Sequence, residues 1–449
     1  MKPSKKAFPR ADGYRGIWYY NQPSEDEYGY KYSGGLGTYC AKHIPLAWHA
    51  EQAGKTFFCY GGVPAGENRL LHMVSYYDHR TGLVPRPTIL LDKATDDAHD
   101  NPTIMLDEEG YLWIFSSAHG IARPAYIHRS AEPYSIDAFE PVATTNFSYP
   151  QAWHLGGSGV LFLHTRYVEG RRMLYWTTSP DGRQWTQPQW LAGICNGHYQ
   201  VSGRCGDKVG TAFNYHPAEG ANYRTNLYYL ETGDFGRTWR TADGKAVETP
   251  VRDVHSPALV HDFAGEGLLV YLKDINFDAE GRPIILVVTS RGYEAGPKAG
   301  PRRWTTAHFN GKAWEIRGTI ESDSNYDTGC LHVPACQPAG RDDDGGWRII
   351  GPTEPGPQPY NPGGEMALWR STDRGRSWVK VRQITSASEF NHTYARRPVA
   401  AHAEFYAFWA DGHGRRPSDS RLYFCDAAGQ AYRLPFEMAG KVAAPEPVG

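Results

Sequence analysis

A hairpin-sized unit recurs along the chain, and each copy begins and ends in polar or aromatic side chains. The clearest copy begins at His99, passes through an apolar run and an acidic turn at 107–110, and returns along 111–115 to His119. Two strands of this length, paired across a tight turn, bring their outer ends to about 5 Å from each other. We therefore expect His99 and His119 to lie together on one rim of the fold.

Seven such units follow one another at intervals of roughly 50 to 80 residues, a period typical of propellers and arrays. The 14 Trp, 29 Tyr and 49 Gly suit many short strands separated by turns. The chain is therefore predicted to be all-β. The units lie at 39–60, 99–119, 149–167, 198–216, 255–274, 330–350 and 397–409.

Three Asp-box turns, at 179–185, 232–239 and 371–378, support this interpretation. In each box the Asp can cap the turn, the Gly allows a positive φ, and the Trp can pack between adjacent sheets. Four strands in each of seven repeats predict a seven-bladed β-propeller, with residues 1–449 as one domain. The long interval 255–330 leaves an eighth blade as the alternative.

Charge and hydropathy exclude several classes of partner. The formal net charge is −2 without a long run of one sign, so neither nucleic acid nor a membrane surface is expected as partner, and we expect a monomer. The basic segment 1–10 has no apolar core behind it and does not read as a signal peptide. A mature or trimmed form would be periplasmic or secreted, and the chain is otherwise expected to be cytoplasmic.

Seven cysteines without a C-x-x-C pair argue against a full disulfide framework. Cys195 and Cys205 could bridge one blade, with buried free thiols as the alternative. Cys330 and His332 form a C-x-H pair that, with His255 and either His261 or Cys336, would make a structural zinc site. The alternatives are a calcium ion in the channel and a buried thiol beside a capped histidine. No organic cofactor is expected, because a P-loop and a dinucleotide fingerprint are both absent.

The predicted mouth of the channel collects His, Tyr and Arg side chains. Histidine can accept a proton near neutral pH, tyrosine can serve as base or acid, and arginine can clamp a carboxylate. Asp100 is the only carboxylate among the residues that bracket the second, third and fourth units, so the carboxylate pair of a conventional glycosidase is missing there. The candidate catalytic residues are His43, His99, His119, Tyr167 and Tyr223. The candidate substrate-binding residues are Asn101, Arg123, Tyr149, Gln151, Arg166, His198, Tyr199, His216 and Arg224.

Several segments resemble the BNR-repeat propeller enzymes that act on linkages between rhamnose and glucuronic acid. This group includes ulvan lyases and L-rhamnose-α-1,4-D-glucuronate lyases, some of which were first described as α-L-rhamnosidases. The resemblance covers nearly the whole chain, and the N-terminal segments look most like the rhamnose-glucuronate branch. The segments are 12–18, 31–37, 99–102, 118–120 and 224–229.

The resemblance implies that His99 and His119 serve the active site and that Tyr167, Tyr223, Arg166 and Arg224 neutralise the uronate and move protons. The expected reaction is β-elimination at the bond from L-rhamnose to O4 of glucuronic acid, leaving a 4,5-unsaturated uronate. The expected partner is an acidic oligo- or polysaccharide that contains both sugars. The alternatives are an ulvan lyase, an α-L-rhamnosidase that hydrolyses the same linkage through His43, and a non-catalytic propeller that binds acidic glycans.

Overall fold

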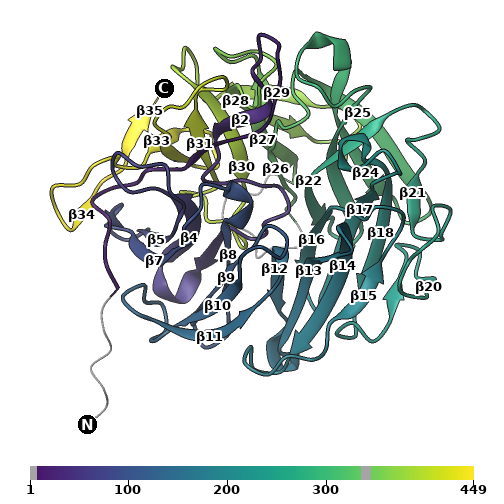
Figure 1. Ribbon diagram of the computed structural model, residues 1–449, viewed down its shortest axis with the longest axis horizontal. Coiled ribbons are helices and arrows are strands. Elements are labelled where there is room, and N and C mark those ends of the chain that lie inside the picture. The colour runs from purple at the N-terminus through teal and green to yellow at the C-terminus, as the bar shows by residue number, and fades with distance from the viewer. Residues whose placement is uncertain (1–7, 335–344, 449) are drawn as a thin grey trace.

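Seven antiparallel sheets surround a central axis in the computed structural model, which describes residues 8–334 and 345–448 (Figure 1). The chain completes one blade before it starts the next, so the last blade lies beside the first. The first strands of neighbouring blades contact one another around the axis. The predicted seven-bladed β-propeller is thereby confirmed.

Blades 1 to 4 occupy the first half of the ring. Blade 1 contains β3 (Ala47–Ala50), β4 (Lys55–Gly62), β5 (Leu71–Asp78) and β7 (Thr88–Asp92). Blade 2 contains β8 (Pro102–Leu106), β9 (Leu112–Ser116), β10 (Ala125–Ser130) and β11 (Phe139–Thr145). Blade 3 contains β12 (Ser148–His154), β13 (Val160–Val168), β14 (Arg171–Ser179) and β15 (Gln189–Ala192). Blade 4 contains β16 (Gln200–Cys205), β17 (Lys208–Tyr215), β18 (Thr225–Thr232), β19 (Trp239–Arg240), β20 (Ala246–Val247) and β21 (Leu259–His261).

Blades 5 to 7 complete the ring. Blade 5 contains β22 (Leu269–Phe277), β23 (Pro283–Ser290), β24 (Arg302–Phe309) and β25 (Trp314–Ser322). Blade 6 contains β26 (Cys330–His332), β27 (Trp347–Glu354), β28 (Glu365–Ser371) and β29 (Val379–Gln383). Blade 7 contains β30 (Asn391–Arg396), β31 (Ala407–Gly412), β32 (Leu422–Cys425), β33 (Ala431–Arg433) and β35 (Glu446–Val448).

The interval 255–330 holds one blade, so the alternative of an eighth blade is wrong. Its first part, including His255, belongs to an extension at the outer edge of blade 4, where β21 pairs with β18. The innermost strand of blade 5 begins only at Leu269. The fifth sequence unit therefore starts at Leu269, and His255 does not stand at the axis side of a blade.

The inner and middle strands of each blade are apolar on both faces because a neighbouring blade packs on each side. In β23 every residue from Pro283 to Ser290 is buried, and its centre is a run of Ile, Leu and Val. Such a continuous apolar run is typical of a strand buried on both faces. The outermost β29 is exposed along its whole length. Burial thus fades from the axis outward, and the apolar content of the strands follows it.

The Asp-box turns fold as the sequence predicts. In the first box, Oδ1 of Asp181 accepts hydrogen bonds from the backbone N–H groups of Arg183 and Gln184, each at 2.8 Å. Gly182 has φ +71° and lies against Trp113 of the preceding blade. The ring of Trp185 packs edge-on against Phe115 of blade 2 and Phe162 of blade 3. The box therefore joins adjacent blades as well as ending a hairpin.

The N-terminal segment closes the ring between blades 1 and 7. Gly16 donates its backbone N–H to Ser420 of blade 7 and forms a bridge with Gly62 of blade 1. Tyr14 donates its backbone N–H to Pro435, and its hydroxyl donates to Pro85 at 2.5 Å. A small sheet of β34 (Val442–Ala443) and β6 (Val84–Pro85) adds a second link. The N-terminal segment therefore bonds to blade 7, and the C-terminal segment bonds to blade 1.

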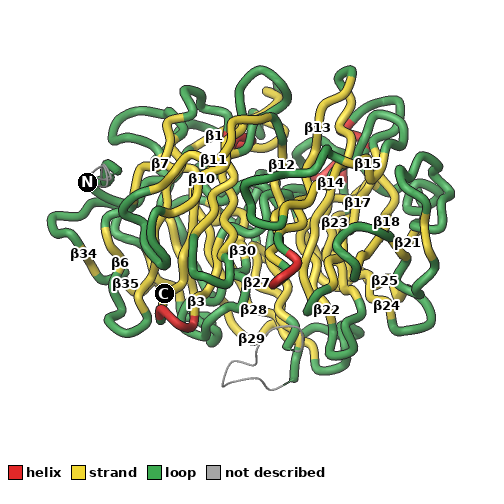
Figure 2. Tube along the Cα trace, turned by 90° about the horizontal axis from the view of Figure 1, so that it is seen from below, coloured by secondary structure: helices red, strands yellow, loops and turns green. Residues whose placement is uncertain are grey.

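A two-stranded hairpin, β1 (Trp18–Pro23) and β2 (Tyr30–Gly35), lies outside the blades on one face of the ring. Strands run from face to face and loops occupy both faces (Figure 2). Helical structure among the described residues consists of short 3-10 turns. They are η1 (Glu51–Ala53), η2 (Ala98–Asp100), η3 (Gly156–Ser158), η4 (Ala221–Tyr223) and η5 (Pro297–Ala299).

Candidate active site

The blade 2 hairpin places His99 and His119 side by side at the mouth of the channel. Pro102 of β8 pairs with Ser116 of β9, so the residues just before the first strand meet those just after the second. The two imidazole rings stack with centroids 4.0 Å apart and planes 12° from parallel. The predicted pairing of these two histidines is confirmed.

Asp97 bridges the two histidines. Its Oδ1 lies 2.6 Å from Nδ1 of His99 and its Oδ2 lies 2.8 Å from Nδ1 of His119. Burial opposes ionisation of this carboxyl, but the two imidazoles outweigh it and hold the pKa of Asp97 well below its usual range. The ionised carboxylate accepts a hydrogen bond from the Nδ1–H of each ring, and in a neutral imidazole that carries its proton on Nδ1 the lone pair lies on Nε2.

The two histidines differ in what surrounds Nε2. In His99 this atom accepts hydrogen bonds from the hydroxyls of Tyr39 at 2.8 Å and Tyr32 at 2.9 Å. Burial and the neighbouring His119 lower the pKa of His99 to about 4, so its ring is neutral at neutral pH. The side chain of His119 is 25% exposed, against 5% for His99. His119 is therefore the member of the pair that solvent and ligands reach.

Blade 3 adds a tyrosine and an arginine next to this pair. Tyr167 of β13 lies directly across from Arg172 of β14, and Nε of Arg172 donates to the Tyr167 hydroxyl at 3.0 Å. The ring of Tyr167 meets the ring of His119 edge-on, with centroids 6.1 Å apart. Burial raises the pKa of Tyr167, which keeps its hydroxyl protonated.

Three cations face the ring of Tyr199. The Arg224 guanidinium lies 4.5 Å from the ring centroid, the Lys42 ammonium 4.9 Å and the Arg172 guanidinium 5.7 Å. Burial would raise the pKa of Tyr199, but Arg172, Arg224 and Lys42 together outweigh it and lower the pKa. Burial also lowers the pKa of Lys42 to about 8. Tyr167 and Tyr199 share one arginine, yet their environments move their pKa values in opposite directions.

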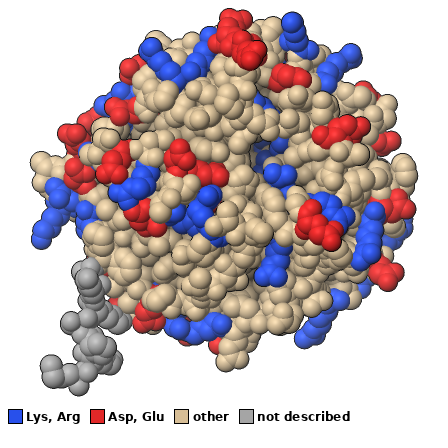
Figure 3. All heavy atoms as spheres, viewed as in Figure 1, with Lys and Arg blue, Asp and Glu red and all other residues tan. Residues whose placement is uncertain are grey.

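The β1–β2 hairpin and blade 5 form the other wall of the mouth. Tyr32 stacks on Tyr326 with centroids 4.2 Å apart, and Arg224 lies 4.5 Å from the ring of Tyr271. Lys31 donates to the side chain of Asn222, and burial with nearby cations lowers the pKa of Lys31 to about 6. Figure 3 shows a hollow near the middle of this face with Lys and Arg atoms inside it. The mouth thus combines aromatic walls with concentrated positive charge.

Two predicted residues line the inner side of this cluster. Tyr149 is buried, with its ring edge-on to Tyr199 at 5.4 Å. His216 is also buried and meets the other side of Tyr199 at 4.7 Å. His43 lies below Tyr149, with centroids 5.6 Å apart and no exposed surface. Burial lowers the pKa of His43 well below its usual range, so its ring is neutral.

Three predicted substrate-binding residues have structural partners instead. Asn101 donates to the backbone oxygens of Leu36 at 2.9 Å and Tyr39 at 2.8 Å. Gln151 donates to the backbone oxygens of Lys42 and Gln200. His198 donates from Nδ1 to the backbone oxygen of Asn214 and accepts at Nε2 from the Ile194 N–H, which engages both ring nitrogens. These interactions hold the loops of the mouth, and direct substrate contact by these three residues stays a prediction.

Three further predicted residues lie beside the cluster. Arg166 reaches the ring of Tyr175, because successive side chains in a strand point to opposite faces of the sheet. Arg166 therefore lies outside the cluster, and Arg172 occupies the position next to Tyr167 that was predicted for Arg166. Tyr223 is 42% exposed and meets Tyr293 edge-on at the outer rim. Arg123 bonds to Asp100 at 2.8 Å and lies 3.4 Å from Asp97, so it supports the carboxylate under the histidine pair.

The predicted zinc ligands do not gather. Sγ of Cys330 lies 3.6 Å from Nε2 of His332, but His255 is exposed at the outer edge of blade 4. Among residues 8–334 and 345–448, neither His255 nor His261 joins Cys330 and His332 in a group that one ion could hold. Cys336, the other possible ligand, lies outside the described residues. The predicted trio His255, Cys330 and His332 is therefore wrong as a metal site, and a calcium ion in the channel stays a prediction.

The predicted bridge between Cys195 and Cys205 is also wrong. Cys195 is free and exposed, whereas Cys205 is disulfide-bonded. Cys40, Cys59, Cys330 and Cys425 are buried free thiols, as the alternative expected. A search of the described residues for a helix long and apolar enough to span a membrane finds none.

Sequence reasoning missed much of the cluster. Asp97 lies two residues before His99 and caps η2. An acidic residue this close to a paired histidine was the sequence signal that could have identified it. Arg172 could have been found from the Glu169–Gly170 turn, which sets the register of β13 and β14. The other members of the cluster reach it through contacts between residues far apart in the sequence, so no local sequence pattern predicts them. They are Lys31, Tyr32, Tyr39, Lys42 and Tyr326.

Comparison with known proteins finds relatives among propeller proteins. The family described as BNR repeat-containing matches residues 72–321. The protein named Ulvan Lyase-PL25 from Pseudoalteromonas sp. (strain PLSV) is 24% identical over 262 residues, which are 49% of this chain and 51% of that protein. An ulvan lyase from Alteromonas sp. (strain LOR) is 22% identical over 261 residues, 49% of this chain and 52% of that protein. The chain thus spans about half the length of the curated relatives it matches.

Solved structures share the whole fold. A PL25 ulvan lyase structure superposes with a TM-score of 0.68 at 16% identity, covering 94% of this chain and 96% of that one. The same values hold for a structure of that enzyme bound to -[GlcA(1-4)Rha3S]-. The polysaccharide lyase Uly1 superposes with a TM-score of 0.61 at 11% identity, covering 95% of this chain and 97% of that one. At these identities the likeness shows the propeller fold.

Proposed function

The chain belongs to the BNR repeat-containing family, and from that premise we propose that it is a polysaccharide lyase that cleaves acidic glycans by β-elimination at a uronate. The observation that carries this proposal is the opposed pair of tyrosines around Arg172. Tyr199 has a lowered pKa and Tyr167 a raised one. Two groups whose surroundings move their pKa values apart are suited to act as base and acid in one reaction.

Elimination begins with removal of the proton at C5, next to the uronate carboxylate. This proton is acidic only when the carboxylate charge is neutralised, because the developing enolate would otherwise carry two negative charges. Arg172, Arg224 and Lys42 supply positive charge where it is needed. Their clustering beside aromatic walls favours an anionic sugar as ligand.

The tyrosinate oxygen of Tyr199 takes the C5 proton, and the electron pair of the C5–H bond forms the C4=C5 double bond. The bond from C4 to the glycosidic oxygen O4 breaks, and the Tyr167 hydroxyl gives that oxygen a proton. Exchange with solvent then restores both tyrosines. His119, with its proton held on Nδ1 by Asp97, offers Nε2 to a sugar hydroxyl.

For the linkage, we propose the bond from L-rhamnose to O4 of glucuronic acid. Two observations support it: the matched relatives named ulvan lyase, and the related enzyme solved with a glycan of GlcA and sulfated rhamnose. The partner would be an acidic oligo- or polysaccharide containing both sugars. Ulvan and gum arabic-type glycans are the two substrate sources to compare.

The test is product analysis on ulvan and on a gum arabic-type glycan. Elimination yields a conjugated unsaturated uronate that absorbs in the ultraviolet, and no water is consumed. Free rhamnose without a rise in absorbance would overturn elimination and favour hydrolysis. Binding of the glycan without any product would indicate a carbohydrate-binding propeller.

The geometry favours Tyr199 over His43 as the reactive centre. His43 has no exposed surface and lies beneath Tyr149, whereas Tyr199 stands among the cations. Phenylalanine at Tyr199 should abolish turnover, since it keeps the ring and removes the oxygen that takes the proton. If His43→Ala abolished turnover while Tyr199→Phe left it intact, hydrolysis through His43 would be favoured and the elimination mechanism would be refuted.

A further inference from the structure

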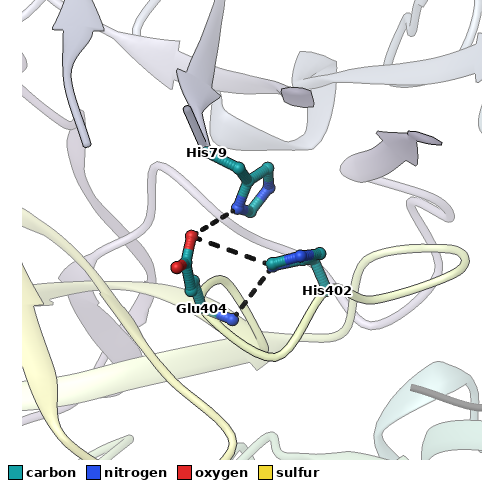
Figure 4. A group of neighbouring side chains, drawn as sticks. All are labelled: His79, His402 and Glu404. Atoms are coloured by element: carbon teal, nitrogen blue, oxygen red, sulfur yellow. Dashed lines mark hydrogen bonds and ion pairs between the residues drawn. The ribbon is translucent and has the colours of Figure 1, made fainter. Parts of the chain in front are cut away.

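A second cluster of histidines lies on the face of the ring opposite the mouth. His79 follows β5 of blade 1, and His402 and Glu404 lie in the connection between β30 and β31 of blade 7. Nδ1 of His79 is 3.0 Å from Oε2 of Glu404, and Nδ1 of His402 is 4.0 Å from the same oxygen. Figure 4 shows the two rings and the carboxylate turned toward one another. This cluster takes no part in the proposed elimination.

The spacing of these atoms matches a tetrahedral ion. Each of the three residues offers a ligand atom within 4.8 Å of the other two. Zinc bonds of about 2.0 Å in a tetrahedron place neighbouring ligand atoms about 3.3 Å apart. The observed 3.0 and 4.0 Å lie on either side of that value, so small side-chain movements would complete the site once Nδ1 of His402 gives up the hydrogen bond that it accepts from the Glu404 backbone N–H at 3.2 Å.

The surroundings orient the ligands as metal sites require. Nε2 of His79 lies 2.8 Å from Oγ1 of Thr56, and that hydroxyl also lies 3.3 Å from Nδ1 of His49. A metal-binding histidine commonly fixes its second nitrogen in this way, which leaves the first free to bind. The Glu404 side chain is 54% exposed, so an ion can enter from solvent and keep a water molecule as fourth ligand.

The backbone holds the two halves of the cluster together without the ion. His49 donates its N–H to the Val399 oxygen at 3.0 Å, and Val399 donates to Ala47 at 2.9 Å. These bonds join blade 1 to the segment that leads to His402. The rings of His79 and His402 have centroids 3.9 Å apart, which keeps a nitrogen of each within reach of one ion.

We propose that His79, His402 and Glu404 bind a divalent cation of the zinc class and that this ion fastens blade 7 to blade 1. Two imidazoles and one carboxylate favour zinc over magnesium or calcium, which prefer oxygen ligands. The ion would act at the ring closure, away from the mouth, and would stabilise the propeller without entering the reaction. The proposal stands independently of the lyase function.

The experiment uses the full-length protein, stripped with a chelator and titrated with zinc chloride or magnesium chloride. We expect zinc to bind in a calorimetric titration and to raise Tm by about 3 °C at a hundredfold excess over Kd. Magnesium should do neither. Absence of zinc binding, or an equal effect of magnesium, would overturn the proposal.

Variants assign the site. His402→Ala and Glu404→Gln should each weaken zinc binding at least tenfold and remove the Tm rise, and Glu404→Gln keeps the fold because its side chain is largely exposed. His261→Ala is the matched control, since His261 pairs with Glu266 at 2.6 Å in blade 4 without a second histidine. Zinc bound at the Asp97 group would persist in all three variants, and that outcome would refute the site proposed here.

Discussion

Replacing Arg172 with alanine tests the electrostatic core of the proposed mechanism. The guanidinium lies 5.7 Å from the centre of the Tyr199 ring and donates to the Tyr167 hydroxyl at 3.0 Å. A unit charge at that distance stabilises a tyrosinate by about 3 kcal/mol at an effective dielectric constant of about 20. The loss corresponds to about a 100-fold fall in kcat/KM at neutral pH.

The assay is the initial rate of ultraviolet absorbance on a rhamnosyl-glucuronate glycan across a range of pH. Tyr199 acts as base only when deprotonated, so the rate rises as pH passes its pKa. Arg172 lowers that pKa, so Arg172→Ala raises it and moves the rise to higher pH. Arg172→Lys retains the charge without the planar fork and should lose less.

Arg166→Ala is the control, because Arg166 lies in the neighbouring strand β13 of the same blade with its side chain against Tyr175. It removes the same charge from the same blade and should leave the rate and its pH dependence near those of the unmodified protein. Equal losses in the two variants, or a pH profile that does not move in Arg172→Ala, would refute the reasoning.

Three other predictions concern the supporting structure. Asp97→Asn should lower kcat by about 100-fold or more with a small change in KM, because the amide no longer fixes the proton on Nδ1 of both histidines; unchanged kcat would contradict this. Asn101→Ala should cost about 1–3 kcal/mol of unfolding free energy in a denaturant titration, since two buried carbonyls lose their donor; a rise in KM at full stability would instead mark Asn101 as a substrate contact. Burial holds the pKa of His99 and His198 at about 4, below the ordinary value of about 6.5. Between these two pH values the unfolded chain binds more protons than the folded protein, so the free energy of unfolding should fall as pH drops from about 6.5 to about 4. An equal Tm at pH values of about 7.5 and 5 would contradict this.

The fold could be predicted from the sequence because its information is local and repeated. Apolar runs and turn residues specify each hairpin, the Asp boxes end hairpins and pack on the neighbouring blade, and the seven copies specify the ring. The pair His99 and His119 was predictable for the same reason, since one hairpin places both. The prediction that His255 begins a blade was wrong because an outer extension of blade 4 resembles the start of a new blade in sequence.

The remainder of the site depends on contacts between blades. Arg166 of β13 and Arg172 of β14 reach opposite faces of the same sheet, and a register error of one residue exchanges those faces. Lys42 and Arg224 meet over Tyr199 from blades far apart in the chain. Gln151 and His198 are residue types that are common in binding sites. The backbone carbonyls to which they donate hydrogen bonds cannot be predicted from the sequence.

The N-terminal closure of the ring sets the order in which the protein can mature. The segment 18–38, which contains the β1–β2 hairpin, is made before the blades, yet it rests on blade 7, where Thr38 donates to the Tyr394 oxygen at 2.9 Å and Trp18 donates to the His413 oxygen at 2.8 Å. The same hairpin carries Tyr32 to His99. During synthesis this segment must wait for nearly the whole chain to leave the ribosome before its partners exist. The mouth is therefore assembled last, and a prematurely ended chain would have blades but no complete site.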